Sequence, residues 1–209
     1  TVKEEKLLLM MKDSKEISSI IDVVKQVINN CCVDSLDVET LATFDIDYIF
    51  VKLRAKSVGE DIELIYSEPE SKDKIKFNVD LDKVEVKFNP DHKKSIPLYD
   101  DVGINMKYPS FKSMYKLENY VNENKTFDDM IYELILDCID NVYDDKQVYS
   151  EFTREDLEQF VLGLPIGCSD KIKGFFDTMP VLEHTVAITN KDGTKKDITL
   201  RGMKDFFIL

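Results

Sequence analysis

The spacing of apolar residues in the amino-terminal quarter of the chain predicts helices. Apolar residues recur at steps of three and four along residues 17–28, which keeps one face of a helix apolar. Apolar residues at 7–11 show similar spacing and predict an earlier helix that starts close to residue 1. A third helix is predicted over residues 41–53, with Thr43 and Asp45 as candidate caps and residues 57–60 as its end. We therefore expect a helical amino-terminal layer.

From residue 62 the spacing changes to two, which is typical of strands. Apolar and polar residues alternate in three short segments, 62–66, 75–79 and 84–88. The polar stretch 67–71 contains a proline and small polar residues, which predicts a hairpin loop between the first two segments. A fourth strand is predicted over residues 103–108. We therefore expect a small antiparallel meander.

Helical spacing returns after residue 125. Two capping boxes, which begin at Thr126 and Thr153, precede apolar stripes over residues 131–142 and 157–164. Pro165 is expected near the first turn of another helix that extends through Phe176. These signals predict a helical carboxyl-terminal half.

The last 26 residues predict a hairpin followed by a short helix. Residues 184–188 and 196–200 alternate on either side of Asp192-Gly193, a pair that suits the positive backbone angles of a tight turn. The final helix carries Met203, Phe206 and Phe207.

Together these elements predict an α+β fold with a helical amino-terminal layer, a small antiparallel meander, and a helical carboxyl-terminal half that ends in a β-hairpin. With 209 residues, 43% of them hydrophobic, the chain can bury one sizeable core. We expect a single domain over residues 1–209, with a division into lobes 1–110 and 111–209 as the alternative.

The charge of the chain argues against nucleic-acid binding. There are 28 Lys and Arg residues against 41 Asp and Glu residues, and the formal net charge of −13 repels phosphate backbones. Apolar stretches are shorter than the roughly 20 residues of a membrane span, and no secretory signal is evident. We expect a soluble cytoplasmic protein that binds neither nucleic acid nor membrane.

Residues for catalysis or for cofactor binding are sparse. The four cysteines form no C-x-x-C motif and only two histidines occur, His92 and His184, so zinc sites and nucleophilic triads are not expected. The acidic run 137–145 lacks the calcium-loop pattern, and none of the 7 glycines builds a phosphate loop. We therefore expect no catalytic residue, no metal, no cofactor and no enzymatic activity.

Two surface features are candidates for partner binding. Lys52, Arg54 and Lys56 place positive charge on one predicted helix of an acidic chain. They either dock an acidic partner or balance neighbouring carboxylates. Phe206 and Phe207 belong to an apolar carboxyl terminus that either packs into the core or is held by a partner.

Five blocks of the sequence resemble the baseplate hub assembly family of T-even phages, in the order in which the family has them. The blocks are 1–9, 43–60, 101–109, 175–184 and 200–207. The positions that match recurring residues of the family are Phe44, Asp45, Leu53, Arg54, Ser57, Gly59, Phe176, Met179 and Pro180. The family includes a baseplate hub subunit and a related hub assembly catalyst. Here the word catalyst means an assembly factor, not an enzyme that makes covalent bonds.

The resemblance implies a protein that binds other baseplate hub and tail proteins, in the host cytoplasm during assembly or in the finished tail baseplate. Family members usually carry a further amino-terminal segment before the block that begins at residue 1, and the sequence leaves open whether this protein has it. Some relatives carry cysteines in the hairpin that corresponds to residues 67–74, where this chain has none, so a metal site is not expected there.

Two other classes of function remain open at this point. One is an enzyme that uses the acidic residues with a metal or a nucleotide, and the other is a regulatory adaptor that binds host proteins. The sequence leaves open the oligomeric state, the stoichiometry, the hub protein contacted, and the choice between hub subunit and assembly catalyst.

Overall fold

The computed structural model describes residues 17–33, 36–68, 74–113, 116–117, 126–190 and 193–206, with side chains from residue 22 onward. The helix predicted over residues 7–11 lies outside these residues. The chain forms two compact units. The terminal unit comprises Thr1–Lys87 and Pro180–Leu209, and the central unit comprises Phe88–Met179. These boundaries do not coincide with the division at residue 110 considered above.

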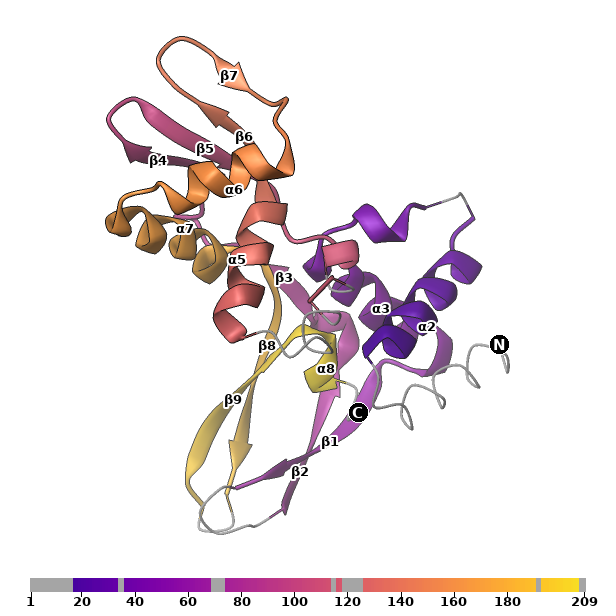
Figure 1. Cartoon of the computed structure of the whole chain (residues 1–209). Helices are drawn as coiled ribbons and strands as arrows, with labels where there is room; N and C mark the ends of the chain where they lie inside the picture. Colours follow the sequence, from indigo (N-terminus) through magenta and orange to yellow (C-terminus); the bar gives the residue numbers. More distant parts are fainter. Residues whose placement is uncertain are drawn as a thin grey trace. The chain divides into compact units, whose positions relative to one another are not determined.

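The terminal unit combines helices with a two-stranded and a three-stranded antiparallel sheet (Figure 1). Its elements are α2 (Ile17–Cys31), η1 (Val38–Thr40), α3 (Thr43–Val58), β1 (Asp61–Ser67), β2 (Lys74–Asp80), η2 (Leu81–Lys83), β3 (Glu85–Lys87), β8 (Val181–Thr189), β9 (Lys195–Arg201) and α8 (Gly202–Phe206). Strands β1 and β2 form one hairpin, and the second sheet has the order β3-β8-β9.

Helix α3 supplies one wall of the terminal unit's core. Its buried Val51 and Ala55 belong to the same apolar cluster as Leu182 of β8 and Phe206 of α8. The helix is capped at its end by Gly59, whose φ of +135° is an angle that glycine adopts far more readily than other residues. The Gly59 N–H donates to the Ala55 carbonyl oxygen at 3.2 Å. The end of this helix was therefore predicted correctly. Its predicted cap is wrong, because the N-cap residue is Ala42, whose side chain forms no capping hydrogen bond.

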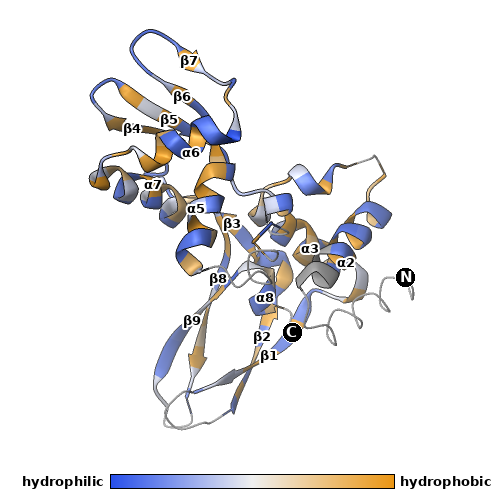
Figure 2. Cartoon of the chain, in the orientation of Figure 1, coloured by the Kyte–Doolittle hydropathy of each residue, from blue (hydrophilic) through white to orange (hydrophobic). Residues whose placement is uncertain are grey.

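The central unit packs helices on a four-stranded antiparallel sheet (Figure 1). Its elements are β4 (Ser95–Tyr99), β5 (Val102–Met106), α5 (Phe127–Cys138), β6 (Ile139–Tyr143), β7 (Val148–Tyr149), α6 (Arg154–Leu162) and α7 (Ile166–Thr178). Apolar and hydrophilic residues occupy different faces of these helices (Figure 2). The buried cluster joins Ile104 of β5, Leu136 of α5, Leu157 of α6, and Ile172 and Phe175 of α7.

Both predicted capping boxes are present. The Thr126 hydroxyl oxygen accepts from the Asp129 N–H at 3.2 Å, while the Asp129 carboxylate accepts from the Thr126 N–H at 2.9 Å. Thr153 and Asp156 exchange the equivalent bonds at the start of α6. Each box satisfies N–H groups that a helix start leaves free, which fixes where α5 and α6 begin.

The predicted meander is wrong. Strands β1 and β2 pair as a hairpin, but β3 pairs with β8, nearly 100 residues later, with Val86 opposite Leu182. A short η2 turn separates β2 from β3, and its Leu81 N–H donates to the Glu60 carbonyl oxygen at 2.8 Å. The strand predicted at residues 103–108 pairs with β4 and β6 instead. Alternation identifies strands, but it does not identify their partners.

The helical carboxyl-terminal half is also wrong, because two strands that were not predicted, β6 and β7, lie within it. Ile139 and Val142 were assigned to the stripe of a helix, yet the helix ends at Cys138 and Ile139 takes extended angles of φ −75° and ψ 120°. Ile139 and Val142 are β-branched and suit a strand as well as a helix. Pairing with β5 decides in favour of the strand. A hydrogen bond between side chains supports this pairing, because the Asn105 N–H₂ group donates to the Asn141 side-chain oxygen at 2.7 Å.

The carboxyl-terminal hairpin is confirmed. Strands β8 and β9 pair in register from Glu183–Arg201 to Thr189–Lys195. Gly193 in the turn has a φ of +86°, as the turn chemistry requires. The short helix α8 follows at once. Within the described residues, no helix combines the length and the apolar character needed to cross a membrane.

Candidate partner-binding surfaces

Two of the three basic residues predicted for partner binding brace α3 against η2. The Lys52 ammonium donates to the carbonyl oxygens of Leu81 at 3.1 Å and Asp82 at 2.7 Å. Lys56 forms ion pairs with Glu60 at 3.1 Å and Asp82 at 2.9 Å, and its hydrogen bonds to Asp82 and Glu60 raise its pKa. Both side chains therefore have neighbours within the terminal unit, and their role in partner binding stays a prediction.

Arg54 and Phe206 also have places inside the terminal unit. Arg54 donates to the Gly59 carbonyl oxygen at 3.3 Å, and burial lowers its pKa. The side chain of Phe206 is 2% exposed and packs in the core cluster of this unit. Phe207 lies outside the described residues. For Phe206, the geometry matches core packing, which was one of the two alternatives for the carboxyl terminus.

A half-buried carboxylate that the sequence did not single out joins α3 to α8. Asp47 accepts a hydrogen bond from the Met203 N–H, and burial raises the Asp47 pKa to about 6. Gly202 lies beside it with a φ of +63°, and a Cβ at this position would lie 3.3 Å from Asp47 Oδ2. No sequence pattern could have found this contact, because about 155 residues separate the two partners.

Ionised Asp47 is expected to destabilise the fold. Since its folded pKa exceeds the ordinary value of 3.8, the folded state holds the proton more tightly than the unfolded state, and stability falls as pH rises towards 6. We expect Asp47→Asn to stabilise the protein by about 2 kcal/mol at pH 7.5 and by about 1 kcal/mol at pH 5.2. Urea unfolding at both pH values measures this difference. Asp197→Asn, which removes an exposed carboxylate from the same unit, is the control, and an equal effect of both substitutions at both pH values would contradict the assignment.

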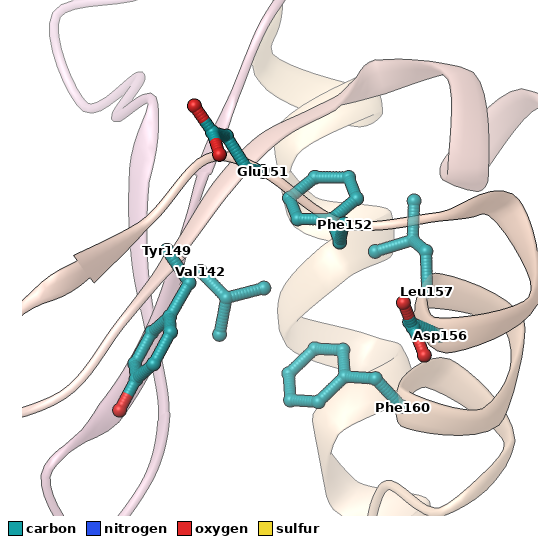
Figure 3. Close-up of a pocket in the computed structure, with 7 residues that line it drawn as sticks. All are labelled: Val142, Tyr149, Glu151, Phe152, Asp156, Leu157 and Phe160. Atoms are coloured by element: carbon teal, nitrogen blue, oxygen red, sulfur yellow. The ribbon is translucent and has the colours of Figure 1, made fainter.

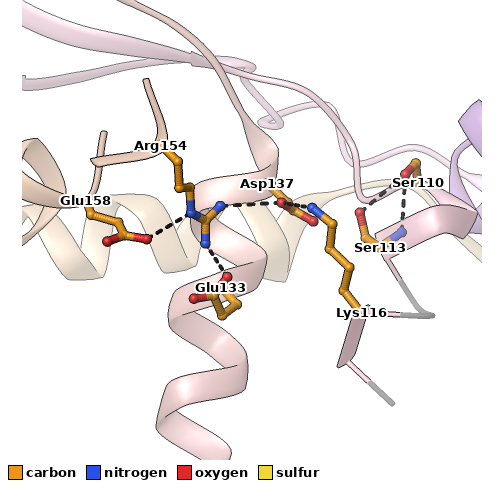
Figure 4. Close-up of polar contacts among 7 residues, drawn as sticks. All are labelled: Ser110, Ser113, Lys116, Glu133, Asp137, Arg154 and Glu158. Atoms are coloured by element: carbon orange, nitrogen blue, oxygen red, sulfur yellow. Dashed lines mark hydrogen bonds and ion pairs between the residues drawn. The ribbon is translucent and has the colours of Figure 1, made fainter. Parts of the chain in front are cut away.

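In the central unit, Arg154 fixes α6 to α5 (Figure 4). It forms ion pairs with Glu133 and, at 3.5 Å, with Asp137, both on α5, and with Glu158 of its own helix at 3.0 Å. Lys116 adds a second cation at 2.6 Å from Asp137. Each of the three carboxylates is paired with a cation, so this cluster braces α6 on α5. No group of three or more metal-ligating side chains occurs within the described residues.

His92 is held in an aromatic cluster. Its ring stacks on Tyr108 and packs against Phe175, with centroid separations of 5.5 Å and 5.0 Å. Thr178 donates its hydroxyl proton to the Gly174 carbonyl oxygen at 2.6 Å, so His92 Nδ1, 3.0 Å from that hydroxyl, is the donor to it. Burial and, to a smaller extent, the charge of Lys94 lower the His92 pKa, which favours the neutral ring. These contacts make His92 a packing residue.

The two cysteine side chains of the central unit are also packing residues. Cys138 and Cys168 are buried in the apolar cluster. Burial, with a smaller contribution from Asp137, raises the Cys138 pKa to about 12. A thiol in this state is a poor nucleophile and a poor metal ligand.

An apolar groove with a volume of about 290 Å³ opens between the β6–β7 hairpin and α6 (Figure 3). Its lining residues are Val142, Tyr149, Glu151, Phe152, Asp156, Leu157 and Phe160. Leu157 is buried, whereas Tyr149 is 41% exposed and donates its hydroxyl to the Asp144 carboxylate at 2.8 Å. This groove was not predicted from the sequence, although Tyr149, Phe152 and Phe160 are closely spaced aromatic residues in a strongly acidic segment.

Comparison with known proteins identifies the family. A family model described as T4 bacteriophage base plate protein matches residues 1–208. No curated protein and no solved structure gives a match. The family match confirms the resemblance to T-even baseplate proteins seen in the sequence, and it covers nearly the whole chain. This chain therefore belongs to the family of T4 bacteriophage base plate proteins.

Proposed function

We propose that the protein binds other proteins of the baseplate hub during assembly of a contractile phage tail and catalyses no bond-making reaction. Membership of the baseplate family supports a role in baseplate structure or assembly. The observation that carries the proposal of a binding role is the open apolar groove of the central unit, which leaves aromatic side chains accessible. Accessible aromatic residues are typical of protein interfaces.

The chemistry of the described residues agrees with a non-enzymatic role. His92 is engaged in aromatic packing, Cys138 is a buried thiol with a raised pKa, and Arg154 is saturated by carboxylates. Each of these three groups has a packing or bracing role. We propose that the protein acts in the host cytoplasm during assembly and is located in the tail baseplate of the virion.

Affinity capture from phage-infected cells tests this function. Tagged full-length protein is recovered late in infection and its partners are identified by mass spectrometry. We expect hub proteins of the baseplate among the partners enriched over an untagged control. Enrichment of host proteins alone would favour an adaptor and overturn the proposal.

The same capture tests the basic group on α3. Lys56→Glu is compared with Lys76→Glu, because both lysines are about two-thirds exposed and both pair with a glutamate in the terminal unit, Lys56 with Glu60 and Lys76 with Glu63. Selective loss of baseplate proteins with Lys56→Glu would support α3 as an interface. Equal recovery with both variants would leave Lys56 as a bracing residue only.

A further inference from the structure

The groove between β6–β7 and α6 has the size of an anchor site for side chains. Small-molecule pockets usually measure about 300–1,000 Å³, and this groove, at about 290 Å³, lies just below that range. Its walls are Val142, Phe152 and Phe160, and its lining includes the buried Leu157 (Figure 3). Such a surface fits one or two apolar side chains of a protein partner.

The segment that lines this groove is acidic. Residues 139–160, which contain every lining residue, hold seven Asp and Glu residues against Lys146 and Arg154, so the segment has a net charge of 2 − 7 = −5. Arg154 is turned towards α5, where it forms ion pairs with Glu133 and Asp137. The positive charge of Arg154 is therefore already matched within the central unit.

Two carboxylates line the groove itself. Glu151 is exposed, with its carboxylate turned outward from the apolar walls (Figure 3). Asp156 is fixed by the capping box, and its hydrogen bonds with Thr153 lower its pKa, so it stays ionised. The groove thus presents an apolar surface between carboxylates, which is complementary to an apolar side chain flanked by lysine or arginine.

We propose that this groove binds a basic, apolar segment of another baseplate protein, with an aromatic or large aliphatic side chain in the groove and Lys or Arg beside Glu151 and Asp156. This inference rests on the proposed function, because it names the kind of partner segment involved. A second copy of this chain suits the groove less well, because each copy carries a net charge of −13 and the copies repel one another.

Affinity capture with groove variants tests the proposal. Tyr149→Ser and Glu151→Lys, separately and together, remove an exposed aromatic wall and reverse a rim charge. We expect the double variant to recover at least one baseplate protein about tenfold less than wild type does. Asp145→Lys is the matched control, since it reverses an exposed charge in the same hairpin outside the lining, and we expect it to recover this partner as wild type does. Thermal melts of all variants check that they fold; Glu151→Lys alters only an exposed side chain and serves alone if the other variant does not fold.

Crosslinking identifies what occupies the groove. A photoreactive amino acid at position 149 of the full chain is activated in infected cells, and the crosslinked peptide is sequenced. We expect a segment of a baseplate protein that combines Lys or Arg with large apolar residues. Crosslinks to an acidic segment or to a second copy of this chain would overturn the proposal, as would a complete lack of crosslinks.

The result separates this inference from the proposed function. If wild type recovers baseplate proteins and the groove variants recover them equally well, the function stands and the groove is not the site. If wild type recovers no baseplate protein, the proposed function fails, and the inference fails with it.

Discussion

Phe175→Ala is expected to destabilise the central unit by about 3–5 kcal/mol, because truncating a buried aromatic ring loses its apolar burial and leaves a cavity. Phe175 is 2% exposed in the core cluster of that unit. Its ring lies 5.0 Å from His92, stacks on Tyr108 at 5.8 Å, and meets the edge of Phe176 at 5.2 Å. Packing against several rings leaves little room for collapse into the cavity.

Urea unfolding of the full chain measures this loss, with Phe127→Ala as the control. Phe127 begins α5 and is 71% exposed, so the same substitution there removes little buried surface and should cost less than about 1 kcal/mol. Similar small losses for both variants would show that Phe175 does not hold the core together.

Gly103→Ala is expected to cost about 1–3 kcal/mol, the usual range for overpacking. Gly103 of β5 lies directly opposite Tyr143 of β6. A Cβ at Gly103 would lie 2.2 Å from the Tyr143 ring carbon Cζ, well inside van der Waals contact. The tyrosine ring therefore covers the glycine, and a methyl group would force it away from Ser95, whose hydroxyl donates to the tyrosine oxygen at 3.2 Å.

A double-mutant cycle isolates this steric cause. In a Tyr143→Ala background the clash is gone, so Gly103→Ala should cost less than about 1 kcal/mol there. Urea unfolding of the four proteins gives the coupling free energy. If Gly103→Ala lowered the free energy of unfolding equally in both backgrounds, glycine would be required here for its backbone conformation and not for the space that the Tyr143 ring fills.

Local signals predicted the helices well. Thr126 and Thr153 were recognised as caps because a capping box involves residues only three positions apart. Gly59 marked the end of α3 for the same reason, since a helix end depends on the conformation of one residue. The register of the last hairpin followed from the turn at Gly193.

Strand partners could not be predicted in this way. The pairing of Val86 with Leu182 joins residues 96 positions apart, and no local pattern records it. Ile139 and Val142 fit both a helical and a strand period, so only their pairing with β5 settles their conformation. The burial of Asp47 by α8 belongs to the same class of long-range contact.

The candidate binding residues show a similar division. The pattern correctly placed Lys52 and Lys56 on a helix, but it gave no information about the carbonyl oxygens and the Asp82 carboxylate that they contact. The groove is more local, since all its lining residues fall between Val142 and Phe160. The capping box predicted at Thr153 correctly places Asp156 in the first turn of α6, but it gives no information about the apolar surface beside this carboxylate.

Affinity capture of the tagged full-length chain from phage-infected cells tests the central claim most directly, because it measures binding to baseplate proteins under assembly conditions. We expect baseplate hub proteins to be enriched from infected cells, and this enrichment to be preserved with Asp145→Lys and lost with the Tyr149→Ser, Glu151→Lys double variant. Recovery of host proteins alone, at the same level from infected and uninfected cells, would contradict a role in baseplate assembly.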